Sequence, residues 1–402
     1  MKIKREIKIK SFIIILILPI FFYINNNQIS FNECSLEGTC IAFGLGSTLL
    51  ILLLPYYILK DKLYFLISLS IFLIFLIEYL LLLDVFLILV TLKSLMPFLF
   101  LLFFFSVKSI IKLKKQSIKF YLEKFIPYTV VFFQIIILFS TSNFFESRSG
   151  IFFLEKETDR WPNFIISFFK VYNYNQYFSF ILVLASSVRI FSSLNKLEVS
   201  FFILIMFYGC LDANNVTAFL CATIIIIYKI LYPLLLKLKN EKIISKFFSF
   251  FFLSLFFLIP IFSFIFVESI IYISEVNDRL ESLEVRLIRW EYIMSNLNML
   301  NMLSGIYPEP FIINQPHNQF LEYVLFFGIV KSFLLLGVIY FVIYRISEIK
   351  YLIPISIIIG IGGSMTEIIT HFYTSQILFL YIIFASSVAR KHSSQSLNFY
   401  NQ

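Results

Sequence analysis

The chain has few of the residues that build metal or redox centres, with 3 histidines, 4 cysteines and 2 tryptophans among 402 residues. No cluster of Cys, His and carboxylates has the spacing of metal ligands, so the sequence predicts no metal site. No glycine-rich phosphate loop follows a strand, and we therefore expect no nucleotide or other cofactor. Charged residues are also scarce, at 14%, whereas 60% of residues are hydrophobic and the mean hydropathy is +0.90. This composition excludes an ordinary soluble domain.

Long apolar runs fill most of the chain. A helix needs about 20 apolar residues to cross about 30 Å of hydrocarbon, and backbone groups in lipid must be satisfied within the segment. The runs are too long and uninterrupted for a barrel of short alternating strands. We predict an all-α membrane protein with about twelve transmembrane helices, in a single polytopic membrane domain over residues 1–402. The predicted spans lie near 9–24, 40–59, 63–80, 86–107, 121–142, 177–194, 198–211, 216–236, 247–272, 319–344, 351–369 and 372–389.

Positive charge is distributed unevenly between the two sides of this topology. With the amino terminus in the cytoplasm, 24 of the 33 Lys and Arg residues fall on the cytoplasmic side. Such a bias sets orientation, so both termini are predicted to be cytoplasmic. The net charge of +9 then follows from topology and does not indicate a nucleic-acid partner. Two sizeable loops face outward, 143–176 and 273–318.

Three boundaries leave alternatives open. The first apolar run follows a basic start, as a signal peptide would, but no small-residue cleavage site follows it and another span is close. Residues 198–211 are short for a crossing, and they either tilt or form a broken helix. Lys331 interrupts the tenth span, so residues 319–330 either belong to it or lie along the interface before the chain turns at Gly328 and crosses.

The cysteines fall into two pairs. Cys34 and Cys40 lie in or beside the first outer loop, where an oxidising compartment permits a disulfide. The alternative is one free thiol and one thiol in the headgroup zone. Cys210 and Cys221 lie in or near apolar helices, where packing is the expected role.

Residues 273–318 interrupt the apolar pattern with side chains that suit chemistry. They hold Arg286, Arg289, Trp290 and the pair His317-Asn318. An outward-facing site has no ATP, so an enzyme there needs an activated substrate such as a sugar linked to a lipid diphosphate. Arginine stays charged and binds phosphate oxygens in pairs. Histidine suits a general base, because its ordinary pKa of about 6.5 lies close to working pH.

Each of these residues also has a simpler interpretation. A loop arginine is often a solvated charge or a headgroup anchor. Asn318 or His317 can cap the helix that is predicted to begin near Gln319. Trp290 and Tyr292 can serve as interfacial anchors.

The order of these residues favours a functional role. The pattern consists of Arg286, Trp290, Gly305, His317-Asn318-Gln319-Phe320-Leu321 and Gly328. It resembles the signature loop of the O-antigen ligase and O-antigen polymerase superfamily, which are multi-span glycosyltransferases of the bacterial inner membrane. In that family an Arg-x-x-x-Trp segment opens a large periplasmic loop, and a His-Asn or His-Ser pair closes it. The resemblance covers mainly residues 280–330.

The resemblance implies a reaction. The expected activity is polymerisation of undecaprenyl-diphosphate-linked O-antigen, or related surface polysaccharide, repeat units at the periplasmic face by inverting, metal-independent transfer. Arg286 and Arg289 are expected to hold the diphosphate, His317 to accept the proton of the acceptor sugar, and Asn318 and Trp290 to help bind substrate. A chain-length regulator and membrane lipid are expected partners. The compact loop favours a polymerase, and a ligase that transfers polymer to the lipid A core is the alternative.

One position departs from the family pattern. The family often has a Ser-Arg pair at the outer start of an earlier span, whereas this chain reads Asn214-Asn215-Val216-Thr217-Ala218, with valine at the arginine position. Either Arg148 or Arg160 in the loop 143–176 makes this phosphate contact instead, or this part of the alignment is wrong.

A flippase or other transporter is the alternative from another class, since twelve spans with both termini inside is a common transporter layout. Charged residues within the predicted spans suit that alternative, and they are Glu78, Lys93, Glu268, Lys331 and Glu367. The lack of repeated halves argues against it. Glu367 and His371 lie four residues apart, hence on one helical face, and we expect them to border the substrate site at the outer end of the eleventh span.

Overall fold

The structure is a computed structural model of the chain, and it describes part of the sequence. The described residues are 28–30, 42–44, 115–140, 175–213, 215–235, 241–265, 281–299, 301–305, 317–366, 368–369 and 372–388, with scattered positions between 69 and 101. The predicted site residues Arg148, Arg160, Glu367 and His371 lie outside these ranges, as do Cys34 and Cys40.

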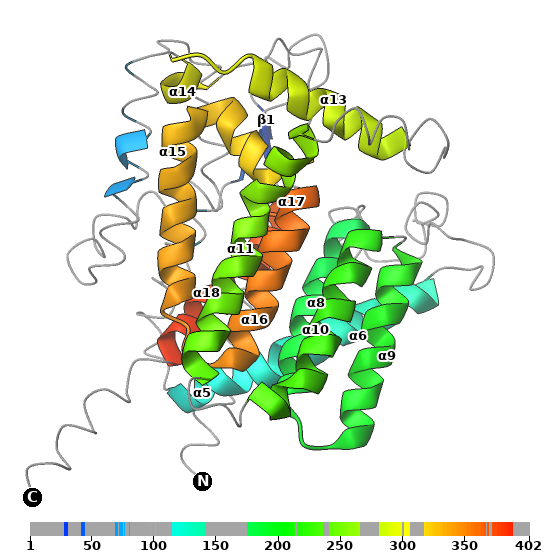
Figure 1. The fold of residues 1–402 in the computed structure, drawn as a ribbon. Coiled ribbons are helices and arrows are strands. Elements are labelled where there is room, and N and C mark those ends of the chain that lie inside the picture. Colours follow the sequence, from blue (N-terminus) through cyan, green and yellow to red (C-terminus); the bar gives the residue numbers. More distant parts are fainter. Residues whose placement is uncertain are drawn as a thin grey trace, which may run out of the picture.

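The described residues are almost entirely helical (Figure 1). In chain order the helices are α5 (Lys115–Phe120), the π-helix η1 (Tyr121–Phe125), α6 (Ile126–Ser140), α8 (Asn175–Ser192), α9 (Lys196–Asp212), α10 (Val216–Leu235), α11 (Glu241–Ile265), α13 (Glu281–Ser295), α14 (Asn301–Ser304), α15 (Gln319–Tyr344), α16 (Ile349–Ile357), the π-helix η5 (Ile358–Gly362), α17 (Gly363–Met365) and α18 (Phe372–Val388).

Three helices are long and apolar enough to cross a bilayer, Val216–Leu234, Lys242–Phe262 and Gln319–Tyr344. Shorter apolar helices run over Phe178–Ser192, Ile349–Met365 and Ile377–Val388. All of them lie in or overlap predicted spans, so the expectation of a helical membrane protein is confirmed for this part of the chain. The predicted number of about twelve spans extends into residues beyond the described ranges.

A short pair of strands was not predicted. β1 (Gln28–Ser30) pairs antiparallel with β2 (Ala42–Gly44), with Ser30 opposite Ala42. β2 occupies three residues, 42–44, that the prediction gave to the helical span near 40–59, so these residues are extended where a helix was predicted. Gly44 and Gly46 weaken helix formation at this point of the sequence, which gives a physical reason for the error.

Helix α8 lies at the centre of the bundle. Its side chains from residue 178 to residue 190 are all buried, as expected of a helix that is covered on every side. It contacts α6, α9, α10, α16 and α18. The small residues Ala185, Ser186 and Ser187 allow these neighbours to approach closely.

Helix α9 decides one of the open alternatives. It is a continuous helix of 17 residues, so the broken-helix alternative for residues 198–211 is wrong. Leu197, Leu204 and Leu211 recur along it at 82%, 71% and 66% exposure, which gives the helix an apolar outer face. Such a face suits contact with lipid.

Helix α15 changes direction at Gly328. The residue has φ of 75° and ψ of 169°, outside the helical region, and the structure divides the helix there. Glycine has no Cβ and accepts this positive φ at little cost. The turn at Gly328, which one of the two alternatives for the tenth span predicted, is therefore confirmed, whereas the position of residues 319–327 relative to the membrane stays a prediction. Figure 1 shows the first part of α15 running at an angle to the rest.

The bundle has two polar ends. Figure 1 shows α13, α14, α17 and the start of α15 at one end, which we call the α13 end, and α5 at the other. η1 continues directly from α5, and its Glu123 pairs with Lys350 near the start of α16 at 2.5 Å. We call this second end the Glu198 end, after the glutamate in the first turn of α9, which Arg189 links to Glu123.

Candidate functional site

Helix α13 carries the two predicted arginines. It packs through Leu287, Trp290 and Ile293, which are 1%, 1% and 0% exposed and recur every three residues along one face. That face contacts α11 and α15. Arg286 and Arg289 are half-buried on the same helix. The sequence thus forms a helix whose apolar stripe fixes its position. Arg286 lies four residues before Trp290 and shares its face, and Arg289 lies beside that face.

Trp290 is part of this packed face. Its ring is among the largest fully buried side chains of the described residues. A tryptophan buried to this extent anchors α13 to the helices beneath it. The predicted contact of Trp290 with substrate stays a prediction.

His317 begins the other half of the site, in an unusual backbone conformation. Its φ is 51°, and no other non-glycine residue that the structure describes has a positive φ. The left-handed region is uncommon for side chains with a Cβ, although histidine enters it more readily than most. Strained positions of this kind persist where the surrounding structure enforces them, and they cluster at functional sites.

Asn318 provides that enforcement. Its Oδ1 accepts a hydrogen bond from the backbone N–H of Leu321 at 2.9 Å, and its Nδ2 donates to the backbone oxygen of Ser364 at 2.8 Å. The side chain is completely buried. The capping role considered for Asn318 is therefore confirmed, and its amide fixes the turn through contacts within the protein.

Gly305 closes α14 onto the start of α15. It has φ of 86°, and a Cβ placed there would lie 2.7 Å from the backbone oxygen of Leu325 and from the backbone of Phe326. Only a residue without a side chain permits this approach. Gly305 and Gly328 of the signature pattern thus allow the backbone conformations on either side of residues 319–327.

The segment after α17 also reaches the start of α15. The backbone N–H of Ile369 donates to Oε1 of Gln319 at 2.7 Å, and Asn318 bonds Ser364 in the same region. Ser364 and Ile369 therefore both contact the start of α15. We did not predict Gln319 and Ser364 as site residues, and the only available signal was the place of Gln319 next to the His-Asn pair.

Position 216 is accessible in this fold. Val216 is 78% exposed at the start of α10. Asn215 caps that helix, since its Oδ1 accepts from the N–H of Ala218 at 2.9 Å while its Nδ2 donates to Ser179 at 3.0 Å. The position at which the family pattern has an arginine can therefore hold a long side chain without repacking.

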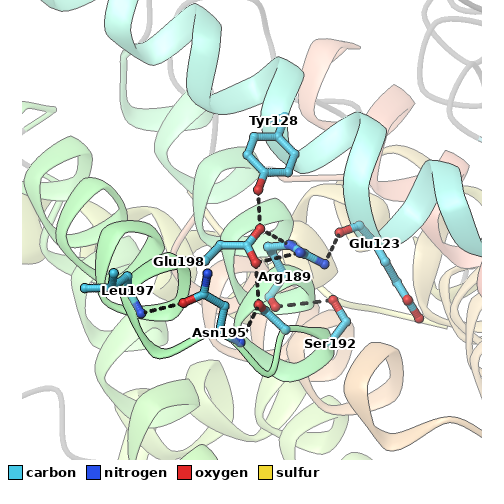
Figure 2. Close-up of polar contacts among 8 residues, drawn as sticks. Glu123, Tyr128, Arg189, Ser192, Asn195, Leu197 and Glu198 are labelled. Atoms are coloured by element: carbon cyan, nitrogen blue, oxygen red, sulfur yellow. Dashed lines mark hydrogen bonds and ion pairs between the residues drawn. The ribbon is translucent and has the colours of Figure 1, made fainter.

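The Glu198 end contains the most extensive polar network that the structure describes (Figure 2). Arg189 holds Glu198 with two hydrogen bonds, from Nε at 2.5 Å and from Nη2 at 2.6 Å. Tyr128 and Ser193 also donate to this carboxylate.

A second carboxylate extends the network to other helices. Glu123 accepts from Tyr351 at 2.6 Å and pairs with Lys350, while its backbone oxygen accepts from Arg189 at 3.3 Å. Each of the two carboxylates therefore pairs with a cation from another helix, Glu123 of η1 with Lys350 of α16 and Glu198 of α9 with Arg189 of α8. These ion pairs can hold the four helices together.

Comparison with protein-family models, with curated proteins and with solved structures finds no match to this chain.

Proposed function

We propose that this chain is a glycosyltransferase of the bacterial inner membrane that polymerises undecaprenyl-diphosphate-linked repeat units of O-antigen or a related surface polysaccharide. One observation carries the proposal. The helix with Arg286 and Arg289 packs against α15, whose first turn follows the left-handed His317. A phosphate-binding residue type and a general-base residue type thus belong to neighbouring elements at one end of a membrane bundle.

The proposed reaction is a direct displacement. The hydroxyl oxygen of the acceptor sugar attacks the anomeric carbon of the donor, and the bond from that carbon to the diphosphate oxygen breaks. The diphosphate leaves with the electron pair, and Arg286 and Arg289 stabilise its charge through paired hydrogen bonds. His317 takes the hydroxyl proton. The anomeric centre inverts, and both termini are proposed to lie in the cytoplasm so that the α13 end faces outward.

The backbone of His317 supports its assignment. A fixed left-handed turn, held by the Asn318 cap and its bond to Ser364, restricts where the imidazole can point. Positioning of a general base matters as much as its chemistry, because proton transfer requires hydrogen-bond reach. The proposed base thus directly precedes the capped start of α15.

The test is transfer by the purified protein, reconstituted with lipid-linked repeat units, for wild type and for His317→Gly and His317→Ala. Glycine adopts the left-handed turn without strain, whereas alanine is strained there. Comparison of the two variants therefore distinguishes loss of the imidazole ring from a change in the backbone. We expect both variants to lose about 10²–10⁴-fold in turnover. Wild-type turnover in His317→Gly would remove the imidazole from the reaction.

The product of a deletion strain identifies the acceptor. Lipopolysaccharide that stops at core plus one repeat unit supports polymerisation. Bare core, with polymer retained on its lipid carrier, assigns the protein as a ligase instead. Movement of lipid-linked sugar across vesicles without bond formation would contradict both and support a transporter.

A further inference from the structure

Gln319 has a fixed amide orientation. Its side chain is completely buried, and its Oε1 accepts from the backbone N–H of Ile369 at 2.7 Å. A backbone N–H can only donate, so the atom facing it must be the amide oxygen. The NH₂ group of Gln319 is then directed to Glu322, whose Oε2 it reaches at 2.9 Å.

Glu322 is therefore held as a hydrogen-bond acceptor in the first turn of α15, five residues after the proposed base. Its backbone N–H donates to the backbone oxygen of Asn318 at 2.9 Å, which places it one turn after the cap. Side chains on a helix lean toward its amino terminus, so the carboxylate leans over the turn that follows His317. Glu322 is half-buried and remains partly accessible.

Glu322 lies in the first turn of α15, before the bend at Gly328, and therefore at the α13 end of the bundle. Helix α13, which carries Arg286 and Arg289, packs against α15.

We propose that Glu322 binds a hydroxyl of the acceptor sugar and that Gln319 is a positioning residue that holds Glu322 in place. This inference rests on the proposed function. A carboxylate has about four acceptor sites on its two oxygens, so it can accept from Gln319 and from a sugar hydroxyl together. No proton is transferred to Glu322. It orients the acceptor, while His317 takes the proton of the attacking hydroxyl.

A residue swap separates this role from a structural one. Glu322→Gln keeps a hydrogen bond to position 319 but loses the charge. Gln319→Glu places two carboxylates against each other. The double variant Gln319→Glu with Glu322→Gln restores a carboxylate–amide pair with reversed polarity, because the new carboxylate still accepts from Ile369.

The readouts are thermal unfolding in detergent and the KM for each substrate. The acceptor probe is a repeat-unit glycoside with a short alkyl chain in place of the lipid diphosphate, which can accept sugar but cannot donate it. Glu348→Gln is the matched control, because Glu348 is a half-buried carboxylate that pairs with Lys350 at 3.0 Å at the Glu198 end.

We expect Glu322→Gln to raise the acceptor KM about 10-fold, with the donor KM and unfolding temperature unchanged. Gln319→Glu should lower the unfolding temperature, and the double variant should recover it while keeping the raised acceptor KM. A double variant with the wild-type acceptor KM would show that the pair is structural and overturn the inference. So would an unchanged KM in Glu322→Gln. Wild-type protein that transfers no sugar would overturn the proposed function and this role with it.

Discussion

The two ends of the bundle use charge in different ways. At the Glu198 end, Arg189 meets Glu198 and Lys350 meets Glu123, so each cation lies against a carboxylate of the same chain. At the α13 end, two arginines lie on a helix that packs against α15, and the polar contacts at the start of α15 fix a backbone turn. Arginine alone therefore does not indicate function. The element that presents the arginine, and what that element packs against, separate the ion pair of the Glu198 end from the candidate phosphate site.

Removing one arginine from the α13 end should produce the largest effect on activity. We expect Arg286→Ala to abolish long polymer while the protein stays in the membrane, because the leaving diphosphate loses its counter-charge. Polymer is measured as the ladder on a lipopolysaccharide gel, and membrane content by immunoblot. A ladder of normal length and intensity would contradict the role of Arg286.

Removing an arginine from the Glu198 end should affect stability instead. Arg189→Ala leaves the Glu198 carboxylate largely buried without its main partner, and breaking such a pair costs about 3 kcal/mol. We expect a lower unfolding temperature in detergent and unchanged turnover per folded molecule. Lys196→Ala, at an exposed position on the same turn, is the control. Wild-type stability of Arg189→Ala would show that this network contributes little to the fold.

A methyl group at Gly305 should have an intermediate effect. Alanine at φ of 86° is strained, and its Cβ would meet the α15 backbone. Strain of this kind costs about 1–3 kcal/mol. We expect Gly305→Ala to lower both stability and turnover, since it moves α14 away from the helix that follows His317. Gly337→Ala is the control, because a Cβ there meets nothing within 4 Å. Equal stability and turnover of the two variants would show that the close approach of Gly305 to α15 is not needed.

The smallest effect on stability is expected from Val216→Arg. Position 216 is 78% exposed, so the change should alter the free energy of unfolding by no more than about 0.5 kcal/mol. If the resemblance aligns this position correctly, the added guanidinium should lower the KM for the lipid-linked donor. Val216→Gln controls for side-chain length. An unchanged or higher donor KM would indicate that this part of the resemblance is misplaced.

The features that the sequence predicted well are local ones. Helix α15 covers the residues of the predicted span 319–344, the asparagine before it caps the helix, and the bend falls at Gly328, as the alternative interpretation of this span expected. Each of these depends on apolar runs, a helix cap or a positive φ, which neighbouring residues determine. The order of the signature residues likewise pointed to elements that pack together, since α13 contacts α15.

The features that it did not predict depend on distant partners. Ile369 bonds Gln319 across 50 positions, and Tyr351 bonds Glu123 across 228. No periodicity connects such residues, because their contact is created by helix packing. The burial of Trp290 could not be predicted from neighbouring residues either. An Arg-x-x-x-Trp spacing places both side chains on one face of a helix, but it does not show whether that face contacts substrate or another helix.

Binding of undecaprenyl diphosphate tests the central claim most directly. Its Kd can be measured for the purified protein in nanodiscs, for wild type, for Arg286→Ala with Arg289→Ala, and for Lys246→Gln at the Glu198 end. We predict that wild type and Lys246→Gln bind with the same Kd, whereas the double arginine variant binds about 100-fold more weakly. An equal Kd for all three proteins would contradict the assignment of the α13 arginines to the diphosphate.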